Sequence, residues 1–538
     1  MNRINIIGAG LAGLSAAITL AENGVPCNLI SLQQSERAQS VLAEGGINGA
    51  LNTMGENDNV ENHFNDTMKG GVFMADQNAV DGLTRNAPKI IRWLESLGVP
   101  FNMNDGEIVL RNFGGQKKKR TAYARSSTGK IIMSAVIAET RKYETSGMII
   151  RYPHHEFVKL LIENNISVGV RVKDTYTNKT YDFKGTVILA SGGMNGIFPG
   201  MTTGTTQNSG DVTAAVFAQG VALGNLEMLQ YHPTTIGISG KRCLVTEAAR
   251  GEGGRLYIER NGEKWYFMEE KYPELKNLMP RDVVAREMYF VRREDSCGDT
   301  VYLDMTDLSE DTWKNKLSDL REEIIHYLSL EPKKEPIPVK EGIHYFMGGI
   351  DTDEYHRTNI KNLYAAGECT CQYHGANRLG GNSMLGAIYG GKVTAKTIIS
   401  ELDKNTVFDN TIPEFKNITD EPLLNDASPV LIGELSEILL GGLGIVRNEH
   451  ELTKSLDLLS NIEHRREYNQ KEKNRIMLAK AMLLSALNRK ESRGAHYRED
   501  YPEKDEEYRK TAVAVMSDGK INISYRKLPE RRANTNEN

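Results

Sequence analysis

The pattern of apolar positions predicts alternating strands and helices at the start of the chain. Residues 3–7, RINII, form an apolar run typical of a short buried strand. Residues 8–24, GAGLAGLSAAITLAENG, continue as a glycine turn and an Ala/Leu-rich helix that ends at Gly24. A second strand-like run, CNLISL, follows at residues 27–32. Strand, helix and strand in this order indicate a parallel α/β sheet.

The later part of the chain repeats this pattern and then changes. Residues 166–190 contain two more strand-like runs, and residues 362–398 contain a second strand, glycine turn and small-residue helix. From about residue 408 the apolar positions fall at helical spacing among many charged residues, so we expect a helical domain there. The last nine residues, ERRANTNEN, are polar, and we expect them to be disordered.

The first glycine turn has the spacing G-x-G-x-x-G between a strand and a helix. Gly8 permits the tight turn, Gly10 lets the backbone approach a pyrophosphate, and Gly13 allows close packing of helix on strand. Leu11 and Ala12 begin the helix, whose N-terminus supplies N–H donors for phosphate. This context predicts a dinucleotide site.

The second strand ends in Ser31, Leu32 and Gln33, where an acidic residue would grip a ribose. Because this acidic residue is absent, the case for NAD as the ligand is weakened more than the case for FAD. The next glycine-rich segment contains Gly45 and Gly46, which suggest backbone approaching a flat or phosphorylated ligand, although a flexible loop would look the same.

Composition narrows the function classes. The 538 residues, 39% of them apolar, predict two or three domains. A net charge of -5 gives no electrostatic reason to expect nucleic acid or an anionic membrane as partner. No run approaches eighteen apolar residues, and no signal peptide is recognisable after Met1, so we expect a cytoplasmic protein.

The cysteines indicate neither disulfides nor a metal. They number five, which is odd, and they are mostly scattered. Cys369 and Cys371 form an isolated C-x-C, which is too little for a zinc site or an iron–sulfur cluster. We therefore predict no metal bound by this chain.

Residues 230–254, QYHPTTIGISGKRCLVTEAARGEGG, are unusually rich in groups that carry chemistry. His232, Thr246, Glu247 and Arg250 lie within this segment, and Glu247 and Arg250 are three positions apart, on one helical face or one tight turn. A structural ion pair would give the same spacing. Two other segments contain further cationic side chains, and these favour an active site over a structural ion pair.

The first of these segments is MPRDVVARE, where Arg281 opens a predicted helix after Pro280. The second spans EGIHYFMGGI and HGANRLGGNS, which contain His344 and Arg378. Taken singly, such cations are usually surface residues. Together with residues 230–254, they predict an anion-binding active site.

With these motifs in order, the chain resembles the flavoprotein subunit family of fumarate reductase and succinate dehydrogenase, which includes L-aspartate oxidase. The resemblance is carried from end to end by GAGLAGL, AEGG, HFNDT, QYHPT, TEAARGEGG, PRDVVARE, HYFMGGI, HGANRLGGNS and SRGAHYRED. It implies an α/β fold with a Rossmann-like, two-dinucleotide-binding FAD domain, an inserted α+β capping domain and a helical C-terminal domain. The implied segments are FAD domain 1–224, capping domain 225–344, FAD domain 345–407, and helical domain with charged tail 408–538.

The resemblance also implies roles for single residues. His232, Thr246, His344 and Arg378 would hold the carboxylates of a small dicarboxylate, and Phe113 would press on its carbon frame. Arg281 would donate the proton, with Glu247 and Arg250 relaying protons to it. The residues that would hold FAD are Gly8, Gly10, Leu11, Ala12, Gly13, Glu44, Gly45, Gly46, Glu368, Asn382, Ser383 and Leu385.

One departure from the family concerns how FAD is attached. Members that link FAD covalently use a histidine five residues before the Gln or Glu of A-[QE]-G-G, and this chain has Gln39 there. We therefore predict non-covalent FAD, which favours fumarate reduction over succinate oxidation. Glu44 in AEGG also resembles the reductase members.

Three functions are compatible with the resemblance. The first is a fumarate reductase flavoprotein subunit that receives electrons from an iron–sulfur partner, since this chain has no cluster motif. Such a subunit would be cytoplasmic or peripheral on the inner face of the cell membrane, meeting the membrane only through its partners. The second is L-aspartate oxidase, and the third is a non-catalytic FAD-binding scaffold.

Overall fold

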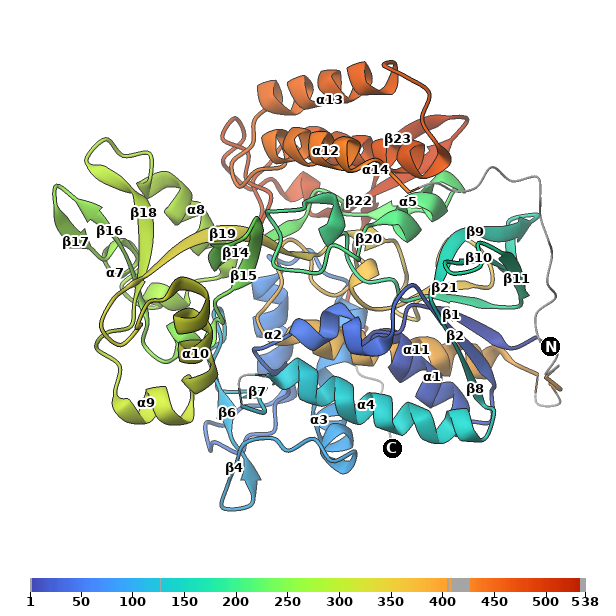
Figure 1. The fold of residues 1–538 in the computed structure, drawn as a ribbon, viewed down its shortest axis with the longest axis horizontal. Coiled ribbons are helices and arrows are strands. Elements are labelled where there is room, and N and C mark those ends of the chain that lie inside the picture. Colours follow the sequence, from blue (N-terminus) through green and yellow to red (C-terminus); the bar gives the residue numbers. More distant parts are fainter. Residues whose placement is uncertain (1, 126, 404–405, 409–425, 533–538) are drawn as a thin grey trace.

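The computed structural model describes residues 2–125, 127–403, 406–408 and 426–532 (Figure 1). A five-stranded parallel sheet in the order β21-β12-β1-β2-β8 forms its base. The strands are β1 (Ile4–Ile7), β2 (Cys27–Ser31), β8 (Ile149–Pro153), β12 (Val187–Leu189) and β21 (Leu363–Ala365). The strands predicted at the start of the chain are confirmed.

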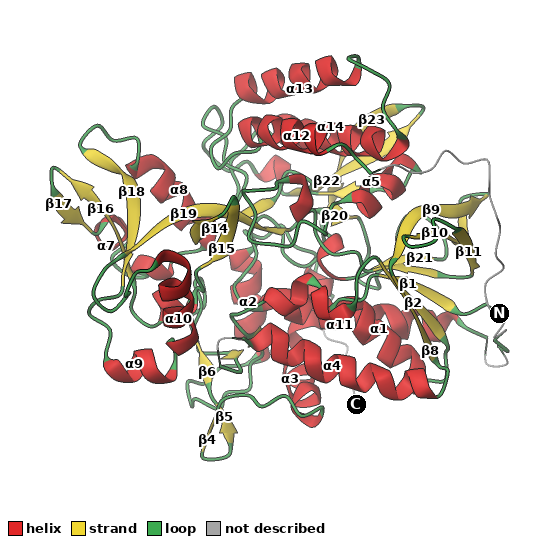
Figure 2. Ribbon diagram, in the orientation of Figure 1, coloured by secondary structure: helices red, strands yellow, loops and turns green. Residues whose placement is uncertain are grey.

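The two faces of this sheet carry different layers (Figure 2). Ile6 and Ile188 pack in a buried cluster with residues of α1, whereas Ile7 and Leu189 pack in another cluster with Phe183 of a small antiparallel sheet. Alternate side chains of a strand point to opposite faces, and for this reason the central strands have apolar side chains on both faces. The layers are formed by α1 (Leu11–Glu22), α3 (Gln77–Ser96), α4 (Thr128–Thr145), α11 (Asn382–Glu401), β9 (His155–Glu163), β10 (Ile166–Asp174) and β11 (Thr180–Lys184).

A six-stranded sheet, which we call the cap sheet, extends to the left in Figure 1 and has its own core around Phe267 and Trp313. Its strands are β14 (Leu229–Ile238), β15 (Lys241–Leu244), β16 (Arg255–Arg260), β17 (Glu263–Trp265), β18 (Cys297–Asp304) and β19 (Ile337–Phe346). Its helices are α6 (Ala248–Gly251), α7 (Phe267–Lys271), α8 (Arg281–Val291), α9 (Glu310–Asn315) and α10 (Ser318–Leu328). The long strands β14 and β19 pair and connect the cap sheet to the rest of the chain.

The C-terminal region contains three helices, α12 (Pro429–Gly442), α13 (Glu449–Glu463) and α14 (Gln470–Asn488). The region predicted as a helical domain with a charged tail also contains two strands that were not predicted, β22 (Lys510–Ser517) and β23 (Lys520–Lys527). The apolar run TAVAV at 511–515 forms a buried strand because it pairs with β13 (Leu223–Gly224), far away in sequence. Residues 409–425 of the predicted region lie outside the described residues.

The predicted disorder of ERRANTNEN is wrong for its first residues. Arg531 forms ion pairs with Glu61 at 2.8 Å and Asp81 at 2.6 Å, and its guanidinium lies 3.9 Å from the centre of the Phe64 ring. Charged side chains can be ordered without apolar burial where several partners converge on them. Residues 533–538 lie outside the described residues.

Shorter elements complete the described chain, and the domain boundaries remain predictions. These elements are β3 (Ile47–Asn48), β4 (Met103–Asn104), β5 (Glu107–Ile108), β6 (Leu110–Arg111), β7 (Thr121–Ala122), β20 (Gly349–Ile350), α2 (Val60–Gly70) and α5 (Asp211–Ala218). Within the described ranges, no helix combines the length and the apolar composition needed to cross a membrane.

Candidate active site

One elongated cavity runs from the glycine turn after β1 to the cap sheet. The predicted site residues in its wall are Gly8, Gly10, Leu11, Ala12, Glu44, Gly45, Gly46, Phe113, His232, Thr246, Glu247, Arg281, His344, Glu368, Arg378 and Ser383. Four other predicted residues, all in the described part of the chain, are not in this wall: Gly13, Arg250, Asn382 and Leu385. The cavity therefore brings the predicted cofactor and substrate residues together.

The glycine turn is shaped by close backbone contacts. Gly8 has φ +117°, and a Cβ there would lie 2.1 Å from the carbonyl oxygen of Ala190. A Cβ on Gly13 would lie 1.9 Å from the carbonyl oxygen of Gly8, so Gly13 acts in packing, behind the wall. A Cβ on Gly10 would meet its nearest atom, Ser40 Oγ, at 3.6 Å. Gly10 thus leaves room for a ligand, as the motif predicts.

The end of β2 shows what stands in place of the missing acidic residue. Ser31 Oγ donates to the carbonyl oxygen of Gln33 at 2.6 Å, and Gln33, Gln34 and Arg37 line the cavity. These side chains were not identified as binding residues from the sequence. No sequence motif marks them, because their place in the wall depends on the path of the chain after β2.

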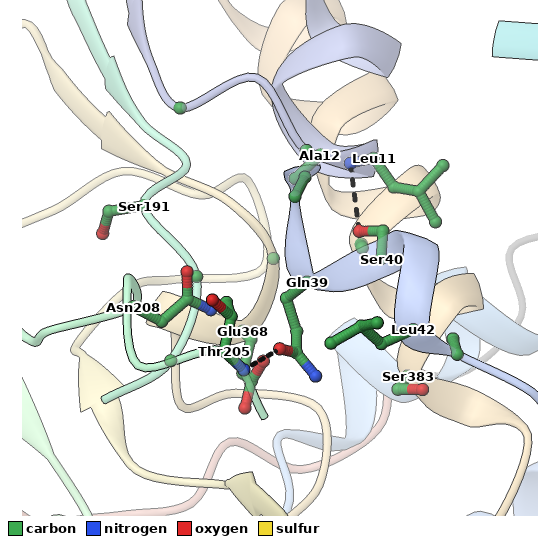
Figure 3. A pocket seen from close by; sticks show the side chains of 18 of the residues that line it. Leu11, Ala12, Gln39, Ser40, Leu42, Ser191, Thr205, Asn208, Glu368 and Ser383 are labelled. Atoms are coloured by element: carbon green, nitrogen blue, oxygen red, sulfur yellow. Dashed lines mark hydrogen bonds between the residues drawn. The ribbon is translucent and has the colours of Figure 1, made fainter. Parts of the chain in front are cut away.

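The next part of the wall joins segments on both sides of the cavity (Figure 3). Gln39 Oε1 accepts from the backbone N–H of Thr205 at 2.5 Å, and Leu11 N–H donates to Ser40 Oγ at 3.4 Å. Gln39 lines the cavity, so its hydrogen bond to Thr205 connects the segment after β2 to the segment after β12.

The carboxyl group of Glu368, a partly buried residue, also lies in this wall. Glu368 Oε1 accepts from Phe346 N–H at 3.2 Å, and burial raises the pKa of Glu368 to about 7. Ser383, at the N-terminus of α11, also lines the cavity, whereas the side chain of its neighbour Asn382 contacts Thr67, His63 and Asn48. The small-residue helix predicted after the second glycine turn is confirmed as α11, but the side chain of its first residue, Asn382, is not part of the cavity wall.

At the cap end, Glu247 joins two guanidinium groups. Glu247 Oε2 accepts from Arg281 Nη2 at 2.5 Å and Nε at 3.1 Å, and Glu247 Oε1 accepts from Arg250 Nη2 at 3.1 Å. Burial by itself would raise the pKa of Glu247, but the charges of Arg281 and Arg250 outweigh it and hold that pKa at about 2. The carboxylate is therefore ionised and forms a continuous hydrogen-bonded path between Arg250 and Arg281.

Gln230 contacts two site residues, but from the sequence it was recognised only as part of the segment 230–254 and not as a site residue. Its Oε1 accepts from Arg281 Nη1 at 3.0 Å and from Arg378 Nη2 at 3.1 Å. Its Nε2 donates to Asn377 Oδ1 at 2.8 Å, which fixes the orientation of the amide. Its position two residues before His232 was the available signal, because alternate residues of a strand share a face.

The two histidines of the cap end lie side by side, with ring centres 5.1 Å apart. Burial, together with the charge of Arg281, lowers the pKa of both His232 and His344 well below the usual range, so both rings are neutral. His344 Nδ1 lies 2.7 Å from Thr203 Oγ1. His232 Nδ1 lies 3.1 Å from the Thr234 carbonyl oxygen and 3.3 Å from the Thr234 nitrogen. If Nδ1 donates to the carbonyl oxygen, Nε2 is an acceptor, and if Nδ1 accepts from the N–H, Nε2 is a donor.

Several buried polar atoms at this end have no hydrogen-bond partner among the described residues: His232 Nε2, Thr246 Oγ1 and Arg378 Nε. Such atoms are costly to bury unless a ligand or water meets them. Burial and the charge of Arg281 lower the pKa of Arg378 to about 9, which still leaves it cationic at neutral pH. The chemistry of this donor set suits a small anion with oxygen acceptors.

Phe113 closes one side of this end of the cavity. A Cβ on Gly45 would lie 2.8 Å from Phe113 Cζ, so the ring packs directly on the glycine loop. The guanidinium of Arg111 donates to the Gly45 carbonyl oxygen and holds the same loop. Phe113 therefore links the cofactor part of the cavity to the anion part.

The residues fit a dinucleotide better than a metal ion. The turn at Gly8, Gly10 and Gly13 leaves a cradle that side chains would fill, and the cavity continues from it to the N-terminus of α11. Two helix N-termini, those of α1 and α11, meet the cavity and offer N–H donors. Among the residues that the structure describes, no group of three or more His, Cys, Asp or Glu side chains has metal-binding geometry.

Comparison with known proteins gives consistent matches along the chain. Residues 4–384 match the family described as FAD binding domain, and residues 433–536 match fumarate reductase flavoprotein C-term. The chain is similar to the succinate dehydrogenase flavoprotein subunit of Bacillus subtilis, with 36% identity over 95% of this chain and 93% of that one. It is also similar to the fumarate reductase flavoprotein subunit of a Serratia strain, with 32% identity over 92% and 88%.

Solved structures agree with this result. A variant of Escherichia coli quinol fumarate reductase superposes with a TM-score of 0.86 and 28% identity, covering 100% of this chain and 98% of that one. The mixed α/β architecture with an FAD-binding domain and a C-terminal domain is therefore confirmed.

Proposed function

This chain belongs to the flavoprotein family of succinate dehydrogenases and fumarate reductases, and we propose on that premise that it reduces fumarate to succinate. It is a flavoprotein oxidoreductase with an FAD-binding domain. The observation that carries the proposal is the convergence of His232, His344, Arg281 and Arg378 at one end of a cavity whose other end is the glycine turn.

The cap end of the cavity is suited to a planar dianion. Arg281 and Arg378 are cationic and share the Gln230 oxygen, which holds them side by side. The unpartnered atoms of His232, Thr246 and Arg378 would bond the two carboxylates. Because the histidines are neutral, they would add no further charge, and His232 would donate to a carboxylate in the tautomer that carries its proton on Nε2.

Arg281 would donate the proton to the substrate carbon. FAD, when bound, supplies the hydride for this reduction. Adding a hydride to one alkene carbon builds basic carbanion character on the other, which a guanidinium can protonate if it is re-protonated afterwards. Glu247 bonds both Arg281 and Arg250, so protons would return to Arg281 along Arg250 and Glu247.

The residues proposed to hold FAD are those of the glycine turn, Glu44, Gly45, Gly46, Glu368 and the α11 N-terminus with Ser383. We propose that the cofactor is not covalently attached, because Gln39 offers an amide in place of an imidazole. Non-covalent binding favours reduction of fumarate over oxidation of succinate.

We further propose that an iron–sulfur protein delivers the electrons. The relatives from Bacillus subtilis and the Serratia strain are named flavoprotein subunits, so they work as parts of larger assemblies. This chain would contact a membrane only through such partners, on its cytoplasmic face. L-aspartate oxidase is the second candidate, and the names of these relatives do not favour it.

Two substrate assays on the purified FAD-loaded protein test the proposal. With reduced viologen and fumarate, we expect the viologen to be oxidised and succinate to form. With aspartate and oxygen, we expect no peroxide. If aspartate gives peroxide and viologen is not oxidised, the protein is an aspartate oxidase. If neither reaction occurs, the FAD-binding scaffold is the remaining candidate.

Substitution of Arg281→Lys tests the proton donor. The shorter ammonium cannot form the two bonds that Glu247 accepts from Arg281, so we expect kcat for fumarate to fall by about 10²-fold to 10⁴-fold. The visible flavin spectrum should not change. Arg286→Lys, in the same helix and beside Tyr497, is the matched control and should keep near-normal turnover. Full activity of the Arg281 variant would exclude Arg281 as donor.

Acid precipitation tests the attachment of the cofactor. We expect yellow FAD to be released into the supernatant, because Gln39 cannot form a flavin bond. Mass spectrometry of the pellet should give the mass of the unmodified chain. Flavin that stays with the precipitated protein would show a covalent link at another residue.

A further inference from the structure

Helix α11 begins at Asn382, which is fully buried, while its neighbours Gly381, Ser383 and Met384 line the cavity. The first N–H groups of a helix have no acceptor within the helix, so this end of α11 presents donors and the positive end of its dipole to the cavity. Gly381 provides no side-chain cap. Something other than a cap must therefore hold this helix end in place.

We propose that His63 is a positioning residue for the cofactor: from α2 it holds the side chain of Asn382 and thereby fixes the N-terminus of α11 beside the flavin. This inference rests on the proposed function, because it takes the flavin ring as the group that this helix end meets.

Helix α2 holds the Asn382 amide at both ends. His63 Nε2 lies 3.0 Å from Asn382 Oδ1, and Asn382 Nδ2 donates to Thr67 Oγ1 at 3.0 Å. His63 and Thr67 are four residues apart and so lie on the same face of α2. All three side chains are almost entirely buried. Two contacts of opposite kind determine both the position and the orientation of the amide.

Asn48 forms a second set of contacts, both to Asn382 and to Gly380, two residues before it. Asn48 Nδ2 donates to Asn382 Oδ1 at 2.8 Å and to the Gly380 carbonyl oxygen at 2.7 Å. Asn48 Oδ1 in turn accepts from Gln116 Nε2 at 3.0 Å and from Thr121 Oγ1 at 2.6 Å. Three distant segments of the chain thus converge on the first turn of α11.

The hydrogen-bond pattern determines the state of the His63 ring. Asn382 Oδ1 can only accept, because Nδ2 is the end that meets Thr67, so His63 Nε2 carries the hydrogen. The other nitrogen, Nδ1, is buried and has no partner among the described residues. Burial and the charge of Arg120 lower the pKa of His63 to about 3, which keeps the ring neutral. His63 therefore acts as a fixed neutral donor.

Arg120 anchors α2 itself. Its Nη2 lies 2.9 Å from Asp58 Oδ1 and 2.9 Å from Asp66 Oδ2, and Asp66 belongs to α2. Arg120 ends a run of four basic residues, 117–120, yet its side chain is fully buried. A buried ion triad of this kind resists displacement, because moving one member leaves another charge unpaired.

The test compares His63→Leu with His63→Gln in the full-length protein. Leu removes the donor to Asn382, so we expect roughly ten-fold weaker binding of FAD to the apoprotein and a lower flavin midpoint potential. Gln keeps an N–H donor and should restore both values towards those of the unsubstituted protein. The KM for fumarate should change less than either, because His63 does not line the substrate end of the cavity.

The matched control is His496→Leu. His496 is also fully buried, and its Nε2 lies 3.1 Å from the Arg489 carbonyl oxygen in the C-terminal region. We expect this change to lower the melting temperature without altering FAD affinity or the flavin potential. If His63→Leu behaves in the same way, His63 has a structural role only and the proposal is wrong.

Thr67→Val provides a second variant if His63→Leu does not fold. It removes the acceptor for Asn382 Nδ2 with little change of volume, and it should also weaken FAD binding and lower the potential. Unchanged values would overturn the proposal as well. FAD affinity and potential are measured without fumarate, so a protein that binds FAD normally but does not reduce fumarate contradicts the proposed function alone.

Discussion

Glu247 determines the charge balance at the cap end of the cavity. It is the carboxylate that Arg281 and Arg250 share, and both guanidinium groups are buried. With Arg378 nearby, the site holds more positive than negative charge, and a doubly negative substrate would restore the balance. The same carboxylate lies on the proposed proton path, so its loss should affect both stability and turnover.

We expect Glu247→Gln to reduce fumarate turnover by about 10²-fold or more, because a neutral amide cannot relay a proton. It should also lower the free energy of unfolding by about 3–5 kcal/mol, since it leaves two buried guanidinium groups without a counter-charge. Steady-state kinetics and urea unfolding measure the two effects. Glu252→Gln, which removes a partly exposed pair with Lys316, should change stability by no more than about 1 kcal/mol.

At the scale of elements, glycine has two different roles in the turn between β1 and α1, one in packing and one in leaving space for a ligand. Gly13 is needed for packing, because a Cβ there would overlap the Gly8 carbonyl oxygen at 1.9 Å. Gly10 has free space around its Cα on the cavity side. The same motif therefore contains one position that serves the fold and one that serves the ligand.

Alanine substitutions should separate these two uses. Gly13→Ala should destabilise the protein or prevent its folding, because α1 must move away from β1. Gly10→Ala should fold with near-normal circular dichroism but bind FAD more weakly, since the methyl group occupies the space left for phosphate. Titration of each apoprotein with FAD, together with thermal unfolding, makes the comparison. Equal loss of stability in both variants would contradict the assignment.

At the scale of the whole molecule, the cavity lies where separately folded parts meet. The cap sheet has its own buried core, and the parallel sheet has another, so neither depends on the cavity for its stability. The seam between them can hold polar and charged side chains that a core would exclude. This arrangement explains why so many buried histidines and arginines gather there.

The buried histidines predict how stability depends on pH. Burial lowers the pKa of six of them in the described part of the chain, to about 3 for His63 and about 4 for His356, and well below the usual range for His232, His344, His374 and His496. Below pH ~6.5 the unfolded chain binds protons that the folded chain does not, so each such histidine destabilises the fold by about 1.4 kcal/mol per pH unit.

We therefore expect the melting temperature to fall as the pH is lowered from about 7 to about 5.5. This range spans the ordinary histidine pKa of about 6.5. Glu368 and Glu44 oppose this trend, because burial raises the pKa of Glu368 to about 7 and the pKa of Glu44 well above its usual value, so the folded chain binds protons there. The six histidines outnumber these two carboxyl groups, so the net direction is a loss. Calorimetry or fluorescence at several pH values measures the effect, and a melting temperature that stays constant or rises would contradict it.

Local features of the chain were predictable from the sequence. The apolar run at 3–7, the glycine turn and the helix from residue 11 follow from side-chain periodicity and backbone freedom, which neighbouring residues determine. The pairing of Glu247 with Arg250 followed from their spacing of three residues. Ordered motifs then indicated the family, which the comparisons confirm.

Contacts between distant segments were decided only by the tertiary structure. The sequence does not show that Gln230 joins Arg281 to Arg378, that His63 meets Asn382, or that Arg120 is buried. The strand at 511–515 and the ion pairs of Arg531 likewise depend on partners hundreds of residues away. Hydrogen bonds and burial depend on position in space, and position is set by how whole elements pack rather than by the residues beside them in the chain.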